Sequence, residues 1–422
     1  MNHLNLIRGA LSVCVAATLL ASCGVLRQAQ DDMQPPTGVP GAMPQSRVLA
    51  ARDDKSNYRV VYRFLGGADG AVPSASLIDV HGTLYGTTTD AGTARAGMIF
   101  SVTTSGSEKP LFSFGKSPGG AFPEANLVDV RGTLYGTTTD GGVPGPGTVF
   151  SITTGGTEKV IHSFGEGTDG AHPVAGLIEV SRKLYGTTSF GGKRHRGTVF
   201  SITTSGSEKV LYSFVPGTDG VYPAGPLIHV GGTFYATTQD GGAYNDGTVF
   251  SVTRSGAEKV LHSFGYGTDG SRPVAGLIAV GSTLYGTTSS GGTYNNGTVF
   301  SITTSGTEKV LHSFAGGTDG SNPSAGLIDV GGTLYGTTPQ GGGSACYCGS
   351  ACYLGCGTVY SISASGAETI LHAFTGGREG ANPRAGLLDV GGILYGTTAF
   401  GGIHDRMCQR STGCGTIFAL SL

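Results

Sequence analysis

Six cysteines near the C-terminal end are the residues of this 422-residue chain whose spacing most directly suggests chemistry: Cys346, Cys348, Cys352, Cys356, Cys408 and Cys414. Thiolates could bind zinc here, but the first four lack the CxxC pair that is usual in zinc sites. An even number of cysteines in an exported chain is typical of disulfides. We therefore expect disulfides and no bound metal. The spacing leaves the pairing of the first four open and favours a bridge between Cys408 and Cys414.

Several short segments that follow Gly-Gly carry residues that could bind a ligand. One segment is basic, which fits either an anion-binding site or a solvated loop. Two combine a tyrosine with an asparagine, groups that sugar-binding sites use, although polar loop tips look alike. Another carries a histidine, an aspartate and an arginine. The candidate ligand-binding residues are Lys193, Arg194, His195, Arg196, Tyr244, Asn245, Tyr294, Asn295, His404, Asp405 and Arg406.

No sequence motif identifies a catalytic site. The GxSxG and HExxH patterns of hydrolases and metalloproteases are absent. Asp90, Asp140 and Asp240 could act as acid and base if they gather at one place, but they recur in phase and copying explains that first. We therefore expect no catalytic residue and no cofactor. A carbohydrate-active hydrolase or lyase that uses these carboxylates stays as an alternative.

Histidines and aspartates also recur in phase. The histidines share their position with Tyr62, Phe112 and Tyr212, so we expect packing rather than metal binding; they are His162, His262, His312 and His372. The aspartates lie in GTDG-like turns, which Asp stabilises through the local backbone. They are Asp69, Asp169, Asp219, Asp269 and Asp319. One carboxylate in each loop falls short of a calcium shell of about six to eight oxygens.

All these residues belong to one repeat. Its landmark is the tyrosine of LYGTT, which occurs at Tyr85, Tyr135, Tyr185, Tyr235, Tyr285, Tyr335 and Tyr395. The first five spacings are 50 residues and the sixth is 60. A period of this size indicates a propeller, a solenoid or an array.

Each copy holds four short runs rich in β-branched and aromatic residues, which favour strands. In one copy they are Leu277–Val280 (run A), Thr283–Thr288 (run B), Thr298–Thr303 (run C) and Val260–Phe264 (run D). Four such strands make an antiparallel propeller blade. The A-to-B and C-to-D turns are uniform, whereas the B-to-C tips differ in every copy. Because binding residues tend to lie on loops over a rigid scaffold, we expect recognition at the B-to-C tips.

The chain ends are out of phase with a whole repeat. The chain begins with a D run at Arg59–Phe64 and ends with a C run at Thr416–Leu422, and it holds seven runs of each kind. In an open solenoid both ends would leave unpaired strand edges. In a closed ring the N-terminal run completes the last blade. We therefore predict an all-β, seven-bladed propeller closed by its N-terminal strand.

The LYGTTxxGG and GTVFSI segments resemble the rhythm of kelch propellers, and they are more similar to the bacterial GloVer tandem-repeat proteins. The resemblance covers about Arg59 to Leu422. It implies an exported or cell-envelope protein and no established reaction. Tyr235-Ala236 and Met98-Ile99 depart from the pattern without altering the expected fold.

The N-terminal segment predicts export. Residues 1–22 have the apolar run and small residues of a secretory signal. Leu20-Ala21-Ser22-Cys23 resembles the lipobox of bacterial lipoproteins, which implies lipidation of Cys23; a plain signal peptide is the alternative. We expect a lipid-anchored disordered linker at 23–57, because it is polar and lacks apolar periodicity. The propeller would then span 58–422.

A formal net charge of −2 gives no indication of nucleic-acid binding. Together these features predict a monomeric, lipid-anchored protein of the bacterial cell envelope, in the outer membrane with its body in the periplasm or at the surface. It would bind a glycan or protein through the B-to-C tips. A purely structural envelope module is a further alternative.

Overall fold

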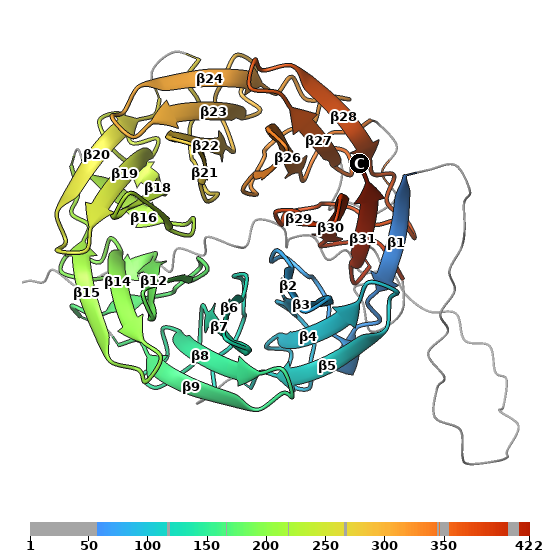
Figure 1. Cartoon of the computed structure of the whole chain (residues 1–422), viewed down its shortest axis with the longest axis horizontal. Coiled ribbons are helices and arrows are strands. Elements are labelled where there is room, and N and C mark those ends of the chain that lie inside the picture. Colours follow the sequence, from blue (N-terminus) through green and yellow to red (C-terminus); the bar gives the residue numbers. More distant parts are fainter. Residues whose placement is uncertain are drawn as a thin grey trace, which may run out of the picture. The chain divides into compact units, whose positions relative to one another are not determined.

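The computed structural model describes residues 57–115, 119–165, 167–217, 219–265, 268–343, 346, 354–403 and 413–422. These residues form a ring of seven antiparallel blades, each with four strands (Figure 1). The predicted seven-bladed propeller is therefore confirmed. The described residues contain no helix with the length and apolar character that crossing a bilayer requires. The predicted signal peptide, Cys23 and nearly all of the predicted linker lie outside the described residues.

The strands follow the four predicted runs, from the channel outward. Blades 1 and 2 contain β2 (Ile78–Val80), β3 (Thr83–Thr88), β4 (Met98–Thr103), β5 (Glu108–Ser113), β6 (Val128–Val130), β7 (Thr133–Thr138), β8 (Thr148–Thr153) and β9 (Glu158–Ser163). Blades 3 and 4 contain β11 (Ile178–Val180), β12 (Lys183–Thr188), β14 (Thr198–Thr203), β15 (Glu208–Ser213), β17 (Ile228–Val230), β18 (Thr233–Gly241), β19 (Thr248–Thr253) and β20 (Glu258–Ser263).

The remaining blades have the same order. Blades 5 and 6 contain β21 (Ile278–Val280), β22 (Thr283–Thr288), β23 (Thr298–Thr303), β24 (Glu308–Ser313), β25 (Ile328–Val330), β26 (Thr333–Thr338), β27 (Thr358–Ile362) and β28 (Glu368–Ala373). Blade 7 contains β29 (Leu388–Val390), β30 (Ile393–Thr398), β31 (Thr416–Ser421) and, from the other end of the sequence, β1 (Tyr58–Arg63).

Short pairings that the sequence did not suggest join each D-to-A loop to the end of strand B. They include β10 (Gly170–Ala171) with β13 (Phe190–Gly191), β16 (Gly220–Pro223) with β18, and single bridges such as Ala121 with Asp140. A 3-10 turn, η1 (Gly67–Asp69), lies in the first such loop. These segments are rich in Gly and Asp, so sequence alone indicates loops. The pairings place the D-to-A loops and B-to-C tips on one face of the ring, hereafter the loop face.

Strands β1 and β31 close the ring. They pair antiparallel from Tyr58 opposite Leu420 to Arg63 opposite Thr416. Phe64, which is fully buried, then packs edge-on against Phe100 of blade 1, with ring centroids 5.1 Å apart. The predicted closure is therefore confirmed, and it buries Phe64.

The same aromatic contact recurs at every blade junction in the described part of the ring. The ring that ends each D run packs edge-on against the run-C ring of the next blade, at 5.0–5.2 Å; the pairs are Phe64–Phe100, Phe114–Phe150, Phe164–Phe200, Phe214–Phe250, Phe264–Phe300, Phe314–Tyr360 and Phe374–Phe418. Edge-to-face rings gain about 0.5–1.5 kcal/mol beyond their buried area. These contacts explain why the repeat keeps an aromatic residue at both positions.

The LYGTT motif also has a structural role in each blade. In blade 5, a Cβ atom on Gly286 would lie 2.7 Å from Cζ of Phe300, so the run-C ring needs glycine beside it. The next residue, Thr287, donates its hydroxyl to the carbonyl of Ala325 in the neighbouring blade, at 3.2 Å. The hydroxyl of Thr288 donates to the carbonyl of Ser290 at the end of its own strand, at 3.0 Å. The motif therefore serves the scaffold.

Candidate functional site

The variable tips between strands B and C present most of the predicted ligand-binding residues on the loop face. Tyr244 and Tyr294 occupy equivalent tips of neighbouring blades 4 and 5, and they are 50% and 58% exposed. Asn245 and Asn295 follow them with φ of 63° and 58°, a left-handed conformation that Asn tolerates better than most residues. Backbone geometry therefore accounts for the asparagines, but it does not account for exposed tyrosines.

The four residues of the predicted basic tip differ in their surroundings. Arg196 donates a hydrogen bond to the hydroxyl of Tyr222, and its guanidinium lies 5.3 Å from the centroid of that ring. His195 occupies the same left-handed position as the asparagines, with φ of 55°. Lys193 and Arg194 are exposed. One of the four side chains, Arg196, thus supports the junction with the next blade.

A ring of residues that precede prolines was not predicted. One such residue from each blade has a left-handed φ of 52–61°: Val72, Phe122, His172, Tyr222, Arg272, Asn322 and Asn382. Each donates its backbone N–H to the last residue of the preceding tip, as Arg272 does to Asp246 at 2.7 Å. Non-glycine residues held in such conformations cost about 1–3 kcal/mol and gather at binding sites. Uniform backbone with seven varied side chains is a feature of recognition surfaces.

The channel holds a pocket of about 250 Å³ lined by the segments that enter the innermost strands. Among its lining residues only Glu124 and Arg384 carry charge. Arg384 donates to the side-chain oxygen of Asn382, and its guanidinium lies 5.6 Å from the Phe400 ring centroid. Burial raises the pKa of Glu124; the nearby charge of Asp140 adds to this effect and Arg384 opposes it. Neither Glu124 nor Arg384 was predicted, although both depart from the small residues at this position of other copies.

Three aspartates, Asp90, Asp140 and Asp240, were candidates for an acid and a base. Asp140 has a histidine beside its carboxylate. Its carboxylate lies 3.1 Å from Nδ1 of His172. Burial raises the pKa of Asp240, while the charge of Arg272 lowers it. The side chain of Asp90 instead accepts the N–H of Ala91, at 2.6 Å. The three aspartates thus occupy equivalent backbone positions, but the side chains and backbone groups around their carboxylates differ.

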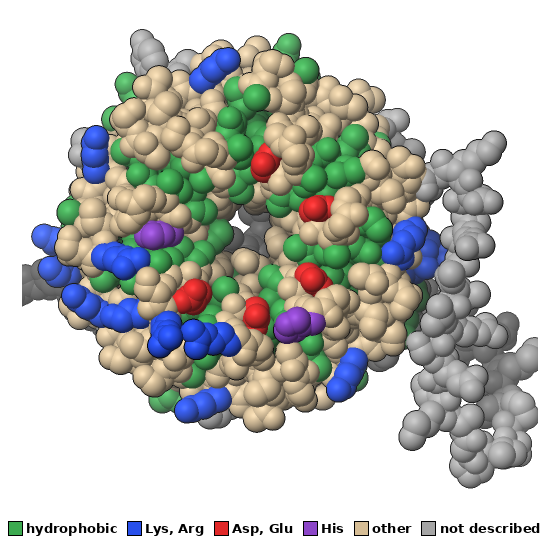
Figure 2. All heavy atoms as spheres, viewed as in Figure 1, with side chains coloured by type: hydrophobic (Ala, Val, Ile, Leu, Met, Phe, Trp, Pro, Cys, Tyr) green, Lys and Arg blue, Asp and Glu red, His purple; other side chains and the backbone are tan. Residues whose placement is uncertain are grey.

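Another set of acidic residues lies at the second position of the innermost strands: Asp79, Asp129, Glu179, Asp329 and Asp389. Figure 2 shows acidic side chains gathered around the central opening, with Lys and Arg side chains farther out. Asp129 and Asp389 accept N–H groups of their own A-to-B turns, at 2.8 and 2.9 Å. These carboxylates therefore stabilise turns.

Comparison with known families agrees with this architecture. The model of the Gloeobacter/Verrucomicrobia repeat matches residues 46–183 and 166–350, which is more than half of the chain. The chain belongs to this family. The sequence resemblance to GloVer repeat proteins is thereby confirmed. No curated protein sequence matches this Gloeobacter/Verrucomicrobia repeat protein.

Two solved structures share the fold of this repeat-family chain. A streptogramin B lyase is 14% identical, with 86% of this chain and 97% of the lyase covered and a TM-score of 0.57. The BP39L lectin from Burkholderia pseudomallei is 8% identical, with 78% and 92% covered and a TM-score of 0.54. At such identities the likeness establishes the fold alone.

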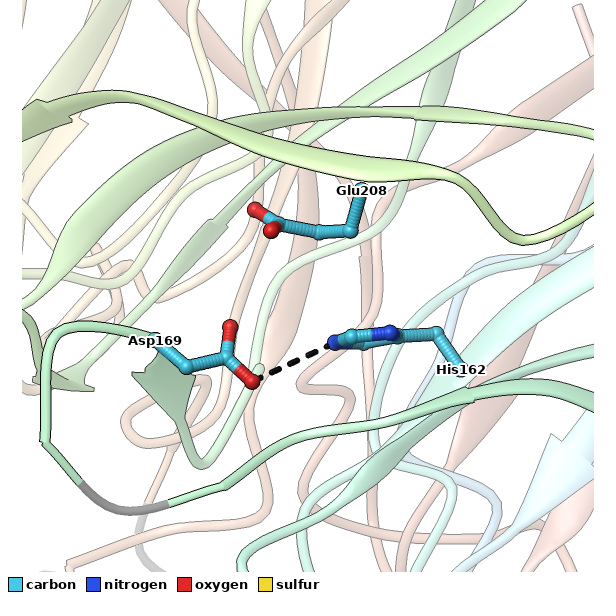
Figure 3. A group of neighbouring side chains, drawn as sticks. All are labelled: His162, Asp169 and Glu208. Atoms are coloured by element: carbon cyan, nitrogen blue, oxygen red, sulfur yellow. Dashed lines mark ion pairs between the residues drawn. The ribbon is translucent and has the colours of Figure 1, made fainter.

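The outer rim of this repeat-family propeller holds further groups of polar side chains, at several of the blade junctions. At one junction, His162 on β9 lies 3.4 Å from Asp169 on the following loop, and Glu208 of the next blade faces both (Figure 3). His162 also packs edge-on against Phe164, at 4.9 Å, as the sequence predicted. Asp169 thus contacts a histidine as well as its own turn. The sequence did not indicate that Glu208 would lie beside these two residues. The spacing of His, Asp and Glu in successive copies is the signal that could have revealed it.

Three of the six predicted disulfide cysteines lie among the described residues: Cys346, Cys356 and Cys414. A disulfide joins Cys346 to Cys356, with 5.3 Å between their Cα atoms, which confirms the prediction for this pair. Cys414 is also disulfide-bonded. The other predicted residues of these two loops lie outside the described residues; they are Cys348, Cys352, His404, Asp405, Arg406 and Cys408.

The rim glutamates make stability depend on pH. Burial raises the pKa of Glu108 to about 8, where the Asp69 charge adds to it, and raises those of Glu158 and Glu258 to about 7. A raised carboxyl pKa means that the folded state holds the proton more tightly. The resulting stabilisation is complete below the unfolded value of 4.5 and is lost as the pH rises through 7–8.

We therefore expect the melting temperature to fall between pH 5 and pH 8.5. Replacing Glu108, Glu158 and Glu258 by Gln should flatten the profile, because Gln needs no proton. Each glutamate is partly exposed to solvent, so screening limits its effect to about 1 kcal/mol or less. The lowered pKa values of Asp169 and Glu379 act below this window. Calorimetry of both proteins across this range measures the difference; equal slopes would contradict the assignment.

Proposed function

We propose that this propeller is a binding protein whose loop face recognises a ligand. Of the two ligand classes that the sequence suggests, glycan and protein, we propose a glycan. The observation that carries the proposal is the pair of exposed tyrosines, Tyr244 and Tyr294, at equivalent tips of adjacent blades. Aromatic rings exposed to water over a rigid scaffold offer large contact area at low entropic cost.

Three features of the loop face support this proposal. The tips vary while the opposite turns are uniform. Left-handed residues around the mouth hold six kinds of side chain at seven equivalent backbone positions. A sugar needs donors and acceptors beside the aromatic surface, and the side chain of Asn245 with the neighbouring Arg272 and Asp246 supplies groups of both kinds. A lectin shares the fold, which is compatible with glycan binding and does not establish it.

We expect Tyr244→Ala and Tyr294→Ala each to weaken glycan binding by roughly 10–30-fold, the effect of losing an aromatic anchor worth about 1.4–2 kcal/mol. A glycan array would first identify the sugar, and calorimetric titration would then compare the variants. Val143→Ala is the matched control, because Val143 is an exposed tip residue of another blade. If both tyrosine variants bind as the parent does, the sugar does not bind at these tips.

A second candidate is a carbohydrate-active hydrolase or lyase at the channel mouth. The observation that favours it is Glu124, whose pKa is raised, beside Asp140, which is paired with His172. Two carboxylates whose environments separate their pKa values suit an acid and a base. Release of reducing ends or unsaturated products from array hits, abolished by Glu124→Gln, would establish this activity; intact sugars after incubation would exclude it for those substrates.

The proposed location is the bacterial cell envelope, with lipid on Cys23 as the anchor and residues 23–57 as the tether to the propeller at 58–422. Several acyl chains anchor a protein stably because each buried methylene contributes about 0.8 kcal/mol. Membership of the repeat family and the disulfide at Cys346 and Cys356 are compatible with export.

We expect Cys23→Ser to leave the propeller folded and to release it from the membrane. Detergent-phase partitioning and labelling with radioactive palmitate measure the anchor, and circular dichroism checks the fold. Continued labelling and membrane partitioning of the variant would contradict the assignment of Cys23.

A further inference from the structure

Three rim junctions each bring one histidine and two carboxylates from neighbouring blades together. The histidine lies on an outermost strand, the aspartate on the loop that follows, and the glutamate at the start of the outermost strand of the next blade. The ligand atoms of each group lie within 4.8 Å of one another; the groups are His162, Asp169 and Glu208, then His262, Asp269 and Glu308, then His312, Asp319 and Glu368. The sequence alone predicts packing rather than metal binding at these histidines.

We propose that these three junctions bind divalent transition-metal ions of the Zn²⁺ class. One imidazole nitrogen and two carboxylate oxygens would be the protein ligands, and water would complete the shell. Imidazole with carboxylate suits Zn²⁺ and its first-row neighbours, whereas Ca²⁺ prefers six or more oxygens. Because each ion would join residues of two blades, it would also strengthen the junction.

The electrostatics of the junctions favour a cation. In each group one glutamate oxygen is shielded from solvent and has no hydrogen-bond partner among the described residues; the atoms are Oε1 of Glu208, Glu308 and Glu368. Each of these glutamates lies beside the carboxylate of its aspartate, so two acidic groups meet at each junction. A dication would offset both charges and give the buried oxygen a partner.

The neighbouring backbone and solvent suit a metal site as well. Asp169 accepts the N–H of Gly165 on one oxygen, at 2.9 Å, and the N–H of Gly170 on the other, at 2.8 Å. Such outer contacts fix the orientation of a ligating carboxylate. A pocket of about 530 Å³ opens beside Asp169 and Glu208, so an ion has an access path and space for bound water. At the second junction, His262 Nε2 already lies 2.8 Å from Asp269.

The other four junctions show what the proposal requires. Tyr62 and Tyr212 stand in place of the histidine and donate their hydroxyls to Asp69 and Asp219, at 2.5 and 2.7 Å. At the next, Phe112 is followed by Gly119 where other copies have the aspartate. At the last, His372 lies beside Glu379, but Tyr58 stands where the third ligand would be and stacks on the histidine at 3.9 Å. Each of these junctions lacks at least one ligand.

The test is Zn²⁺ stoichiometry of the purified full chain, measured by equilibrium dialysis and elemental analysis with the disulfides kept oxidised. The combined variant His162→Phe, His262→Phe and His312→Phe should lose three equivalents, and Zn²⁺ should no longer raise its melting temperature. Phe already occupies this position at residue 112, so the variant keeps a side chain that the fold accepts. Unchanged stoichiometry in the folded variant would overturn the proposal.

A gain of binding provides the second readout. Tyr212→His restores the missing ligand beside Asp219 and Glu258 and should add one equivalent of Zn²⁺. Phe112→His is the matched control, because Gly119 offers no carboxylate there, and it should add none. Equal results for these two variants would contradict the ligand assignment, because a histidine alone would then account for any binding.

Discussion

Deleting Tyr58–Phe64 is expected to lower the melting temperature of the whole propeller and to cause aggregation. The segment is the outer strand of blade 7, and its removal leaves the edge of β31 unpaired. It also removes Phe64 and Tyr58, which pack on Phe100 and His372 of the neighbouring blades. Each such side chain stabilises the fold by roughly 1.5–3 kcal/mol when fully buried. Calorimetry and light scattering measure the two effects.

A deletion of Leu26–Ser46 is the matched control, because it shortens the chain outside the propeller and should change neither quantity. A strand deletion that melts like the parent and stays monomeric would show that the N-terminal strand does not close the ring. The solenoid alternative would then have to be reconsidered.

Phe264→Ala should destabilise the propeller by about 3–5 kcal/mol, the usual cost of removing a buried aromatic side chain. Phe264 and its partner Phe300 are fully buried, and their rings bridge blades 4 and 5 with centroids 5.0 Å apart. Because the ring of blades is closed, a loosened junction also strains its neighbours. Urea denaturation provides the free energy of unfolding.

Lys259→Ala is the control for this substitution. Lys259 lies on β20, which ends directly before Phe264, and it is exposed, so its loss should change stability by about 0.5 kcal/mol or less. If Phe264→Ala costs no more than the control, the aromatic contacts between blades are not what holds the ring together.

The fold could be predicted because every copy of the repeat carries the same pattern of strands and turns. Seven copies of one pattern reveal strands, turns and closure, and the orphan run at each end has a partner only in a ring. The runs were placed to within two residues; the D strand begins at Glu258 rather than Val260, because the backbone of Glu258 pairs with Val252 although its side chain is polar. The short pairings of the D-to-A loops were missed because glycines at those positions obscure them.

The candidate sites were predicted less completely. The exposed tyrosines could be found, since aromatic residues at variable tips stand out against uniform turns. The rim groups could not be found from single residues, because Glu308 lies 46 positions after His262 and only the ring brings them together. The left-handed residues before the prolines were missed because side chains of six different types share one backbone conformation there.

The most direct test of the proposed function is hydrogen–deuterium exchange of the propeller with and without the sugar that a glycan array identifies. The account predicts slower exchange in the B-to-C tips of blades 4 and 5, around Tyr244 and Tyr294, and at the left-handed residues of the same face. It predicts no change at the uniform A-to-B and C-to-D turns. Protection confined to those turns, or to the outer rim, would contradict recognition at the loop face.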